Sequence, residues 1–369
     1  MKTFINFFRS DLLFSISFIL AIIACGAGRF ALSFVDGDVI LTLLGLMAVI
    51  KVLERLGVLD FFAAKLIQLS KDERALVTNL TFLAFFSSMI LTNDIAILTL
   101  LPVFLKIIGR NKAFKSKILG TTLIIIAANL GSSSLPFGNP QNLYLYGYYD
   151  VPFGQFEIWM LPFFLLSAVS LLVITRFINK NPLEVSSPQL KKISTRQLAL
   201  ALVGLLLMIL AILHILPLAI AVVVSILLVV LADLKALKEV DYRLLATFIF
   251  FFLIVGNLAE IPTFVAFIQN IMGNFLSVLV GSSLISQLIS NVPAALLLAP
   301  FTEQSQALLL GVNIGGLGTL VASLANLIGF KVFSLYAPGE KGKLLRNFSL
   351  LNFCLLAVFL LFFSLFNFF

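Results

Sequence analysis

The stretch NLGSSSLPFGNPQN, residues 129–142, decides how this chain can be arranged. It lies between the apolar run ILGTTLIIIAA, residues 118–128, and the aromatic run LYLYGYY, residues 143–149. Glycine, proline, serine and asparagine are poor helix formers, and a lipid bilayer has no water to satisfy the backbone groups that they release. Such a break is costly where lipid surrounds it, and it is tolerated where protein buries it or where it lines a wet cavity.

The composition predicts a helical membrane protein with several spans. Of the 369 residues, 61% are hydrophobic and only 11% are charged, and long apolar runs alternate with short charged loops. At about 20 residues for each span, the chain has room for roughly ten spans and little for a soluble domain. The expected surroundings of the protein are therefore a lipid bilayer.

The formal net charge of +8 does not indicate a nucleic-acid partner, because Lys and Arg lie in loops between apolar runs and form no aromatic-interleaved patch. The two cysteines, Cys25 and Cys354, lie in apolar runs without a CxxC or CxxH neighbour, and we interpret both as core residues. No cofactor is expected.

Charge placement predicts the orientation of the chain in the membrane. With the amino terminus inside, at Lys2 and Arg9, the basic loops fall on the cytoplasmic side, and Arg29 is the one exception among 25 Lys and Arg residues. The carboxyl terminus then lies outside, and the chain is expected as a multi-pass protein of the cytoplasmic (inner) membrane. A signal peptide at the amino terminus is the less favoured alternative, because the first apolar run continues to Phe34.

The chain contains two copies of one pattern. The segment from Asp38 has a counterpart from Asp241, LTNDIAILTLLPVF at residues 91–104 lines up with ISNVPAALLLAPFT at residues 289–302, and the opening stretch aligns with NIGGLGTLVASLAN at residues 313–326. By the predicted topology the copies have opposite orientations. Inverted repeats with broken helices that meet near mid-depth are the architecture of secondary transporters. The two interruptions are therefore predicted to line one cavity.

These observations predict an all-α polytopic membrane protein with two inverted repeats, each containing a re-entrant helical hairpin and a broken transmembrane helix. The predicted parts are a first transmembrane helix at residues 1–35; inverted repeat 1 at 36–176, with a hairpin at 76–105 and a broken helix at 118–147; a linker with two connecting helices at 177–240; and inverted repeat 2 at 241–369, with a hairpin at 275–302, a broken helix at 307–330 and a final helix at 347–369.

Each repeat is expected to place a hairpin tip beside a broken helix. About 13 residues before Thr92 rise only about 20 Å, less than a hydrocarbon thickness of about 30 Å, so the tip is expected to end partway through the membrane. Freed carbonyls and Asn oxygens there suit a small cation such as sodium, and half-helix N-termini suit an anion. The predicted substrate- and ion-binding residues are Thr92, Asn93, Asp94, Ser134, Gly138, Asn139 and Asn142 in repeat 1, and Ser290, Asn291, Gly318, Thr319 and Asn326 in repeat 2. At each of these positions a packing role is the alternative, because small residues also allow helices to approach closely.

Asp94 breaks the symmetry of the repeats, because its counterpart is Val292. A carboxylate within a membrane-spanning segment is costly and usually marks an ion or proton pathway. We expect Asp94 to ligate the coupling cation or to carry the coupled proton, with hydrogen bonding to the opposing hairpin tip as the alternative. The candidate sodium ligands are Asn93, Asp94 and Asn291.

The strings TNDIAILTLLP, GNPQN and SNVPAALLLAP resemble those of the ion transporter superfamily. Over about residues 35–365 the chain is most similar to the citrate-transporter-like permeases, which include arsenite permeases, NhaD-type sodium/proton antiporters and, more distantly, divalent-anion:sodium symporters. The resemblance implies elevator-type movement of a transport domain against a scaffold, commonly in a homodimer. Symporters of the superfamily carry Ser-Asn-Thr at both tips, whereas this chain has Thr92-Asn93-Asp94 and Ser290-Asn291-Val292, which puts a dicarboxylate substrate in doubt.

We therefore expect a secondary active transporter of a small anion, either carboxylate-like such as citrate or an oxyanion, coupled to sodium or protons. Arsenite or antimonite efflux and sodium/proton exchange remain open. A nucleotide-driven pump is disfavoured because no GxxxxGK[ST] occurs, and an enzyme because one His and no HExxH or GxSxG leave few candidates for a general base or nucleophile. A channel is a further alternative, since Asn-Pro breaks also occur in water channels. There, however, the Asn-Pro pair is duplicated, whereas here GNPQN aligns with ASLAN.

Overall fold

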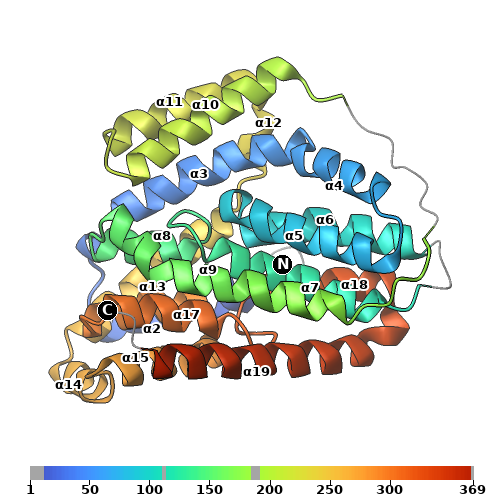
Figure 1. The fold of residues 1–369 in the computed structure, drawn as a ribbon. Coiled ribbons are helices and arrows are strands. Elements are labelled where there is room, and N and C mark those ends of the chain that lie inside the picture. Colours follow the sequence, from blue (N-terminus) through green and yellow to red (C-terminus); the bar gives the residue numbers. More distant parts are fainter. Residues whose placement is uncertain (1–11, 110–113, 184–191, 367–369) are drawn as a thin grey trace. The chain divides into compact units, whose positions relative to one another are not determined.

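The computed structural model describes residues 12–109, 114–183 and 192–366, and every regular element in these ranges is a helix (Figure 1). Lys2 and Arg9, on which the predicted orientation partly depends, lie outside the described residues. The chain divides into two compact units. Unit 1 comprises Met1–Arg55, Ser194–Asn274 and Leu296–Glu303, and unit 2 comprises Leu56–Ile193, Phe275–Ala295 and Gln304–Phe369.

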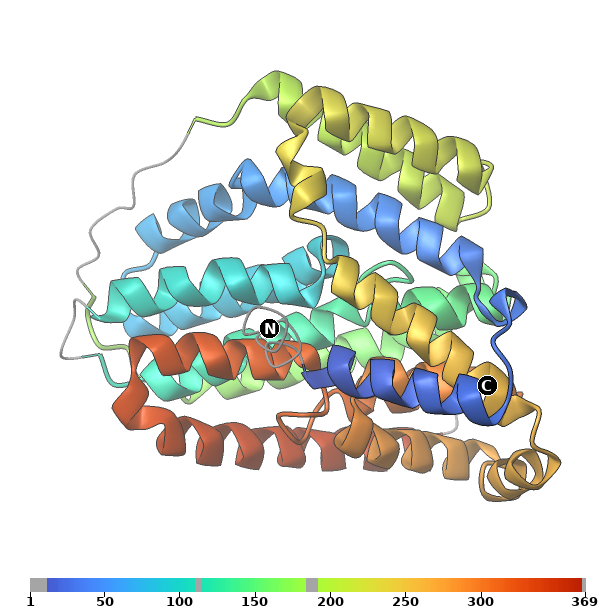
Figure 2. The ribbon, with the colours of Figure 1, turned by 180° about the vertical axis from the view of Figure 1, so that it is seen from behind.

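Unit 1 is built on the long helix α3, against which the helical hairpin of α10 and α11 packs (Figure 1). On another side of this unit α2 packs beside α13, and the two are seen together in Figure 2. The approach of α10 to α3 is close because Gly204 faces Val49 without a side chain of its own. The elements of unit 1 are α2 (Leu12–Ala27), η1 (Leu32–Phe34), α3 (Gly37–Arg55), α10 (Thr195–Ile212), α11 (Leu218–Asp233), α12 (Lys235–Lys238), α13 (Tyr242–Ala259), α14 (Pro262–Ile271) and η2 (Ala299–Phe301).

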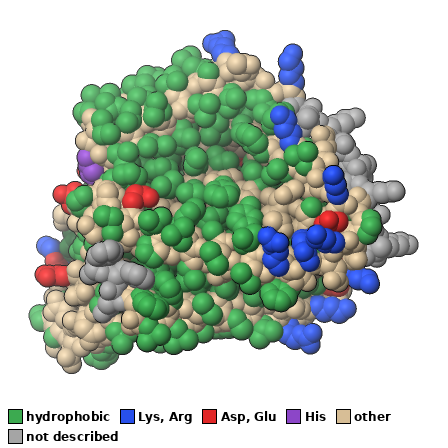
Figure 3. All heavy atoms as spheres, in the orientation of Figure 1, with side chains coloured by type: hydrophobic (Ala, Val, Ile, Leu, Met, Phe, Trp, Pro, Cys, Tyr) green, Lys and Arg blue, Asp and Glu red, His purple; other side chains and the backbone are tan. Residues whose placement is uncertain are grey.

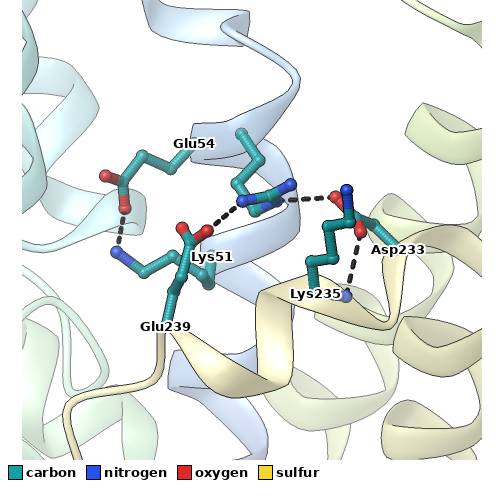
Figure 4. Close-up of polar contacts among 6 residues, drawn as sticks. Lys51, Glu54, Asp233, Lys235 and Glu239 are labelled. Atoms are coloured by element: carbon teal, nitrogen blue, oxygen red, sulfur yellow. Dashed lines mark hydrogen bonds and ion pairs between the residues drawn. The ribbon is translucent and has the colours of Figure 1, made fainter.

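A cluster of charged side chains forms ion pairs at one end of unit 1 (Figure 4). Arg55, the last residue of α3, pairs with Asp233 at 2.6 Å and with Glu239, and Lys51 pairs with Glu54 one turn earlier. The guanidinium thereby joins the end of α3 to the ends of α11 and α12, with two carboxylates sharing its planar set of donors. The chain passes into unit 2 directly after this anchored residue.

Unit 2 contains the first helical hairpin, the first arm and the tip of the second hairpin, and both broken helices. Its elements are α4 (Val58–Gln68), α5 (Glu73–Leu91), α6 (Asn93–Gly109), α7 (Lys117–Ser132), α8 (Pro140–Tyr148), α9 (Phe153–Arg176), α15 (Phe275–Ile289), α16 (Asn291–Leu298), which begins in this unit, α17 (Ser305–Gly315), α18 (Leu324–Tyr336), η3 (Pro338–Glu340) and α19 (Lys341–Leu365).

The hairpins pack on the broken helices at two matched crossings, α5 on α7 and α15 on α17. A Cβ atom added to Gly131 would lie 1.9 Å from the carbonyl oxygen of Phe85 and 2.5 Å from Oγ of Ser88. A Cβ atom added to Gly315 would lie 2.6 Å from Oγ of Ser286. Gly131 aligns with Gly315, and Ser88 with Ser286, so both repeats use a glycine to bring hairpin and broken helix together.

The two broken helices of unit 2 run in opposite directions. In Figure 1 the chain passes from α7 to α8 one way and from α17 to α18 the other way. Helix α7 packs against α18, and α8 packs against α17, so each first half lies beside the second half of the other repeat. This reciprocal pairing is the one expected for inverted repeats.

Glu73 holds together the ends of three segments at one end of unit 2. Its buried carboxylate accepts hydrogen bonds from the backbone N–H groups of Lys115 and Ser116, from Oγ of Ser116, and from Nδ2 of Asn181 at 3.0 Å. The carboxylate thus lies at the N-terminus of α7, where the helix dipole favours a negative charge. At this end of unit 2 the space-filling view shows Lys and Arg side chains, and apolar side chains cover much of the rest of its visible face (Figure 3).

Five helices in the described residues are long and apolar enough to cross a membrane: Glu73–Leu91, Phe153–Arg176, Thr195–Ile212, Tyr242–Ala259 and Pro338–Leu365, the last including η3. Shorter apolar helices accompany them, among them both halves of the second broken helix. The chain is therefore an integral membrane protein.

The first hairpin arm is longer than the sequence suggested. Asp72 caps α5 by accepting a hydrogen bond from the N–H of Ala75, and the helix then runs 19 residues to Leu91, about 28 Å. The expected length of about 13 residues, based on the apolar run alone, is wrong because the polar first turn of the helix is buried through Glu73. The length of α5 therefore does not by itself place Thr92 at mid-depth. The matching arm of the second hairpin, α15, is shorter, with 15 residues and a length of about 22 Å.

Two further helices were not predicted. Helix α4 forms in a stretch expected to be a cytoplasmic loop, and it follows Gly57, whose φ of 69° lies in the left-handed region. Helix α14 forms between α13 and the second hairpin and has no buried residue, and Phe264 contacts Phe301 edge to face. Both are short amphipathic helices, which a search for long apolar runs does not detect.

Candidate functional site

The tips of the two hairpins have the same unusual backbone conformation. Thr92 joins α5 to α6 with φ of 70°, and Ser290 joins α15 to α16 with φ of 77°. Positive φ is rare for any residue with a side chain and is an outlier for a β-branched one, at a cost of about 1–3 kcal/mol. The matched strain at aligned residues indicates that the surrounding structure imposes this conformation on both tips.

An asparagine follows each strained residue, and both asparagines are buried. Asn93 is 8% exposed and Asn291 is 5% exposed. Each uses its Oδ1 atom to accept the N–H of the next residue at 3.0 Å, which satisfies one free donor at the start of α6 and of α16. The two differ in their other contacts: Nδ2 of Asn93 donates to Oδ1 of Asn129 at 3.0 Å, whereas the backbone N–H of Asn291 donates to the carbonyl of Ala322 at 3.0 Å.

The helix breaks are stabilised by asparagine side chains from their own repeat. Nδ2 of Asn142 donates to the carbonyls of Ser133 at 2.9 Å and Leu135 at 3.1 Å. Nδ2 of Asn326 likewise donates to the carbonyls of Gly316 at 3.0 Å and Thr319 at 3.1 Å. These carbonyls were expected to be free for a cation. The structure instead pairs them with amides, which removes the cost of unpaired backbone groups inside the unit.

The two repeats are joined by a reciprocal pair of asparagine bonds. Nδ2 of Asn129, in α7, donates to Oδ1 of Asn326, in α18, at 2.6 Å. Nδ2 of Asn313, in α17, donates to Oδ1 of Asn142, in α8, at 2.7 Å. Each bond links the first half of one broken helix to the second half of the other. We call these four side chains the asparagine square.

The side-chain oxygens of Asn129 and Asn313, which take no part in the reciprocal pair, accept hydrogen bonds from aligned residues of the two repeats. Oδ1 of Asn129 accepts from Oγ of Ser323 at 3.0 Å, and Oδ1 of Asn313 accepts from Nδ2 of Asn139 at 3.2 Å. Ser323 and Asn139 are aligned residues at the starts of α18 and α8. Asn139 also caps α8, because its Oδ1 accepts the N–H of Asn142 at 2.8 Å.

Several residues at the breaks were not among the predicted site residues. They are Asn129, Asn313 and Ser323, together with Gln141, whose Nε2 donates to Oδ1 of Asn313 at 3.4 Å, and Gln287, whose Nε2 donates to the carbonyl of Gly315 at 2.8 Å. The aligned repeats show Asn129 duplicated as Asn313, and this duplication could have indicated that both belong to the site. Gln287 had no such signal, because the first repeat has Met89 at the corresponding position.

Small residues shape both breaks. A Cβ atom on Gly138 would lie 2.2 Å from the carbonyl oxygen of Ser132, so only glycine fits there. Gly318 has φ of 102°, and a Cβ atom there would lie 2.2 Å from Oε1 of Gln287. Ser134, 4% exposed, has an Oγ atom without a hydrogen-bond partner among the described residues. A buried hydroxyl in that state costs free energy unless something binds to it.

Asp94 lies in the first turn of α6, half-buried and directly beside Asn93. A carboxylate at a helix N-terminus is favoured by the helix dipole, which offsets part of the cost of its burial. The structure therefore places the one charged residue of the predicted set at a hairpin tip. All twelve predicted site residues belong to unit 2.

Two inverted repeats with paired hairpins and antiparallel broken helices define a class, the helical membrane transporters. The chain belongs to the citrate transporter family, whose model matches residues 11–309. An uncharacterized transporter of Methanocaldococcus jannaschii is 33% identical over 303 residues, 81% of each chain. The inner membrane protein YbiR of Escherichia coli is 30% identical over 316 residues, 81% of this chain and 80% of that one.

The fold also resembles a solved transporter structure. The crystal structure of the Alcanivorax borkumensis YdaH transporter, noted for its unusual topology, matches with a TM-score of 0.56 at 18% identity over 89% of this chain and 84% of that chain. At this identity the likeness shows the fold alone. The chain is thus a membrane transporter of the citrate transporter family.

Proposed function

We propose that the protein is a secondary active transporter that moves a small anion, either carboxylate-like such as citrate or an oxyanion, across the cytoplasmic membrane, coupled to sodium or protons. The observation that supports this most directly is the convergence of two strained hairpin tips and two broken helices within one compact unit. Non-helical backbone in a membrane protein is tolerated where it is buried or lines a cavity, and paired breaks are where transporters bind their substrates.

The chemistry of the two tips suits an anion and a cation together. The N-terminal ends of α6 and α16 begin at the tips, and their N–H groups and dipoles favour negative charge. Oxygen atoms suit a hard cation, and the unpartnered Oγ of Ser134 is one such atom. The proposed cation ligands are Asn93, Asp94 and Asn291, and the proposed binding residues remain the twelve named from the sequence.

The division of the chain supports an elevator-type mechanism of alternating access. Because every proposed binding residue lies in unit 2, the bound substrate would move with that unit as one body. The asparagine square joins the two repeats inside the unit, so both half-sites would keep their geometry during the movement. Unit 1 is the proposed scaffold, and by family resemblance it is the proposed contact surface of a homodimer in the lipid bilayer.

Exchange of sodium for protons is the second candidate function, and Asp94 favours it. Asp94 has no counterpart in repeat 2, where Val292 stands, so a single carboxylate at the tips could alternate between a cation and a proton. Arsenite or antimonite efflux is a further proposal within the same family resemblance. An enzymatic role is not proposed.

The proposed location is the inner membrane, with the amino terminus in the cytoplasm and the carboxyl terminus outside. The name of the Escherichia coli relative, an inner membrane protein, supports the membrane, and the positive-inside rule supports the orientation.

The test begins with the purified protein. Thermal-shift screening against organic anions, oxyanions and sodium over a range of pH identifies ligands, and liposome flux then measures transport of each one. Asp94→Asn is expected to lose ion-coupled uptake and its pH dependence. Asp241→Asn is the matched control, because Asp241 caps α13 in unit 1 by accepting the N–H groups of Arg243 and Leu244, and Asn caps a helix equally well. Full coupled uptake by Asp94→Asn, with unchanged pH dependence, would exclude the coupling role of Asp94.

A further inference from the structure

Gln287, near the end of α15, inserts its side-chain amide into the second helix break. Its Nε2 atom lies 2.8 Å from the carbonyl oxygen of Gly315 and 3.0 Å from those of Leu317 and Ser283. Its Oε1 atom accepts the backbone N–H of Thr319 at 2.9 Å, and this obligatory donor sets the orientation of the amide. Three carbonyl oxygens therefore converge on one nitrogen.

This arrangement is one that a cation would occupy. An amide nitrogen has two hydrogens and cannot donate fully to three acceptors at once, whereas a cation is attracted by all three carbonyl dipoles. Groups of backbone carbonyls at unwound helix segments coordinate sodium and potassium in membrane proteins. The amide of Gln287 thus fills, as part of the protein, a position with the coordination of an ion site.

The residues around Gln287 are arranged to fit its amide. Gly318 lacks the Cβ atom that would lie 2.2 Å from Oε1 of Gln287. Oγ of Thr319 donates to the carbonyl of Gln287 at 3.2 Å and accepts the N–H of Ala322 at 3.1 Å. Gly318 and Thr319, both predicted to bind substrate or ion, lie against Gln287 in this structure.

The first repeat differs at both corresponding positions. Met89 stands where the second repeat has Gln287, and a methionine has no hydrogen to donate. Ser134 stands where the second repeat has Gly318, and its buried Oγ has no partner among the described residues. One break therefore carries an internal amide, and the other carries an unpartnered oxygen.

We propose that Gln287 substitutes for a cation at the second helix break, so that the transporter has a single coupling-cation site, the one proposed at Asn93, Asp94 and Asn291, and none at the carbonyls that Gln287 contacts. This inference rests on the proposed function for the coupling and on the inverted repeats for the equivalence of the two breaks. It predicts the stoichiometry of coupling, with one cation bound in each transport cycle, and names Gln287 as the residue that determines it.

Gln287→Glu tests the substitution without changing the size of the side chain. The carboxylate places an oxygen against three carbonyl oxygens, which is repulsive unless a cation or a proton lies between them. Melting temperatures of the purified full-length protein are measured in NaCl and in choline chloride at equal ionic strength, at neutral and acid pH. We expect the melting temperature of Gln287→Glu to rise by roughly 3 °C more than that of the wild type on addition of sodium at about 100 times the dissociation constant, or on acidification.

Gln197→Glu is the matched control. Gln197 also donates Nε2 to a backbone carbonyl, that of Ala232 at 2.7 Å, but it contacts one carbonyl and lies in unit 1. This variant is expected to keep the sodium and pH dependence of the wild type. If Gln287→Glu cannot be recovered folded, Gln287→Met is the alternative variant. It introduces the residue type of Met89 in repeat 1 and removes the amide donor from the three carbonyl oxygens, so its melting temperature is expected to gain the same additional sodium dependence.

The result that overturns the inference is a folded Gln287→Glu or Gln287→Met protein with the ion dependence of the wild type. A Hill coefficient near two for the coupling cation in wild-type uptake also overturns it, and a coefficient near one supports it. The proposed function is tested separately: wild-type liposomes without saturable, gradient-coupled uptake would refute it and leave the stability comparison valid.

Discussion

The close crossing of α5 and α7 predicts that Gly131→Ala destabilises the protein. An added Cβ atom would lie 1.9 Å from the carbonyl oxygen of Phe85, while a normal contact between carbon and oxygen is about 3.3 Å. The helices would have to separate by about 1.4 Å, because a backbone carbonyl cannot rotate away as a side chain does. The same shift would stretch the bond of 3.0 Å between Asn93 and Asn129 beyond hydrogen-bonding distance.

The magnitude follows from two opposing effects. Overpacking costs about 1–3 kcal/mol, and a backbone clash belongs at the upper end of that range. Alanine regains about 1 kcal/mol of helix propensity relative to glycine. The expected net loss is about 2 kcal/mol, which corresponds to a melting temperature lower by roughly 3 °C for a chain of this length.

The assay is thermal unfolding of the purified protein, with liposome uptake for each folded variant. Gly147→Ala is the control on the same broken helix, because Gly147 is exposed and an added Cβ would have no atom of the described residues within 4 Å, its own helix and chain neighbours aside. It is expected to match or exceed the wild-type melting temperature through helix propensity alone. If Gly131→Ala melts within about 1 °C of the wild type, the packing argument for the hairpin position is refuted.

Two further variants test the connections inside unit 2. Asn313→Ala removes the donor to Oδ1 of Asn142, so we expect the free energy of unfolding to fall by about 1–3 kcal/mol and uptake to be reduced. The control Asn347→Ala, at an exposed position, should change little. Equal melting temperatures for the two variants would contradict a structural role for the asparagine square. Glu73→Gln exchanges one acceptor oxygen for a donor that faces backbone N–H groups, so we expect the free energy of unfolding to fall by about 1.5–3 kcal/mol. The control Asp72→Asn, which keeps the cap of α5, should unfold near the wild-type temperature. A Glu73→Gln protein as stable as the wild type would show that this carboxylate does not hold the ends of the helices.

Much of the fold was predictable because its signals are local. The apolar runs predicted the helices, the string GNPQN at residues 138–142 predicted the break before α8, and the duplicated tips predicted the equivalence of Thr92 and Ser290. The start of α5 was misplaced because the buried acid Glu73 belongs to the helix, although its polarity suggested a loop. Its burial depends on Lys115, Ser116 and Asn181, which are distant in the sequence.

The candidate site was only partly predictable for a related reason. The sequence named the asparagines at tips and breaks, but each amide has a donor and an acceptor end, and the partner of each end is set by packing. Asn142 and Asn326 were predicted to bind substrate or ion, and in the folded protein their amides donate to the carbonyls of their own breaks.

The sequence by itself determined the class of protein, the inverted duplication and the places where helices break, because hydrophobicity, charge and glycine or proline act over a few residues. Only the tertiary structure decided which polar groups are already paired. It showed that Asn129 and Asn313 join the repeats. It also showed that Gln287 donates to the carbonyls of the second break, while at the first break Oγ of Ser134 is left without a partner among the described residues. The reason is that a hydrogen bond requires two groups at about 3 Å, and such pairs are brought together here from positions far apart in the chain.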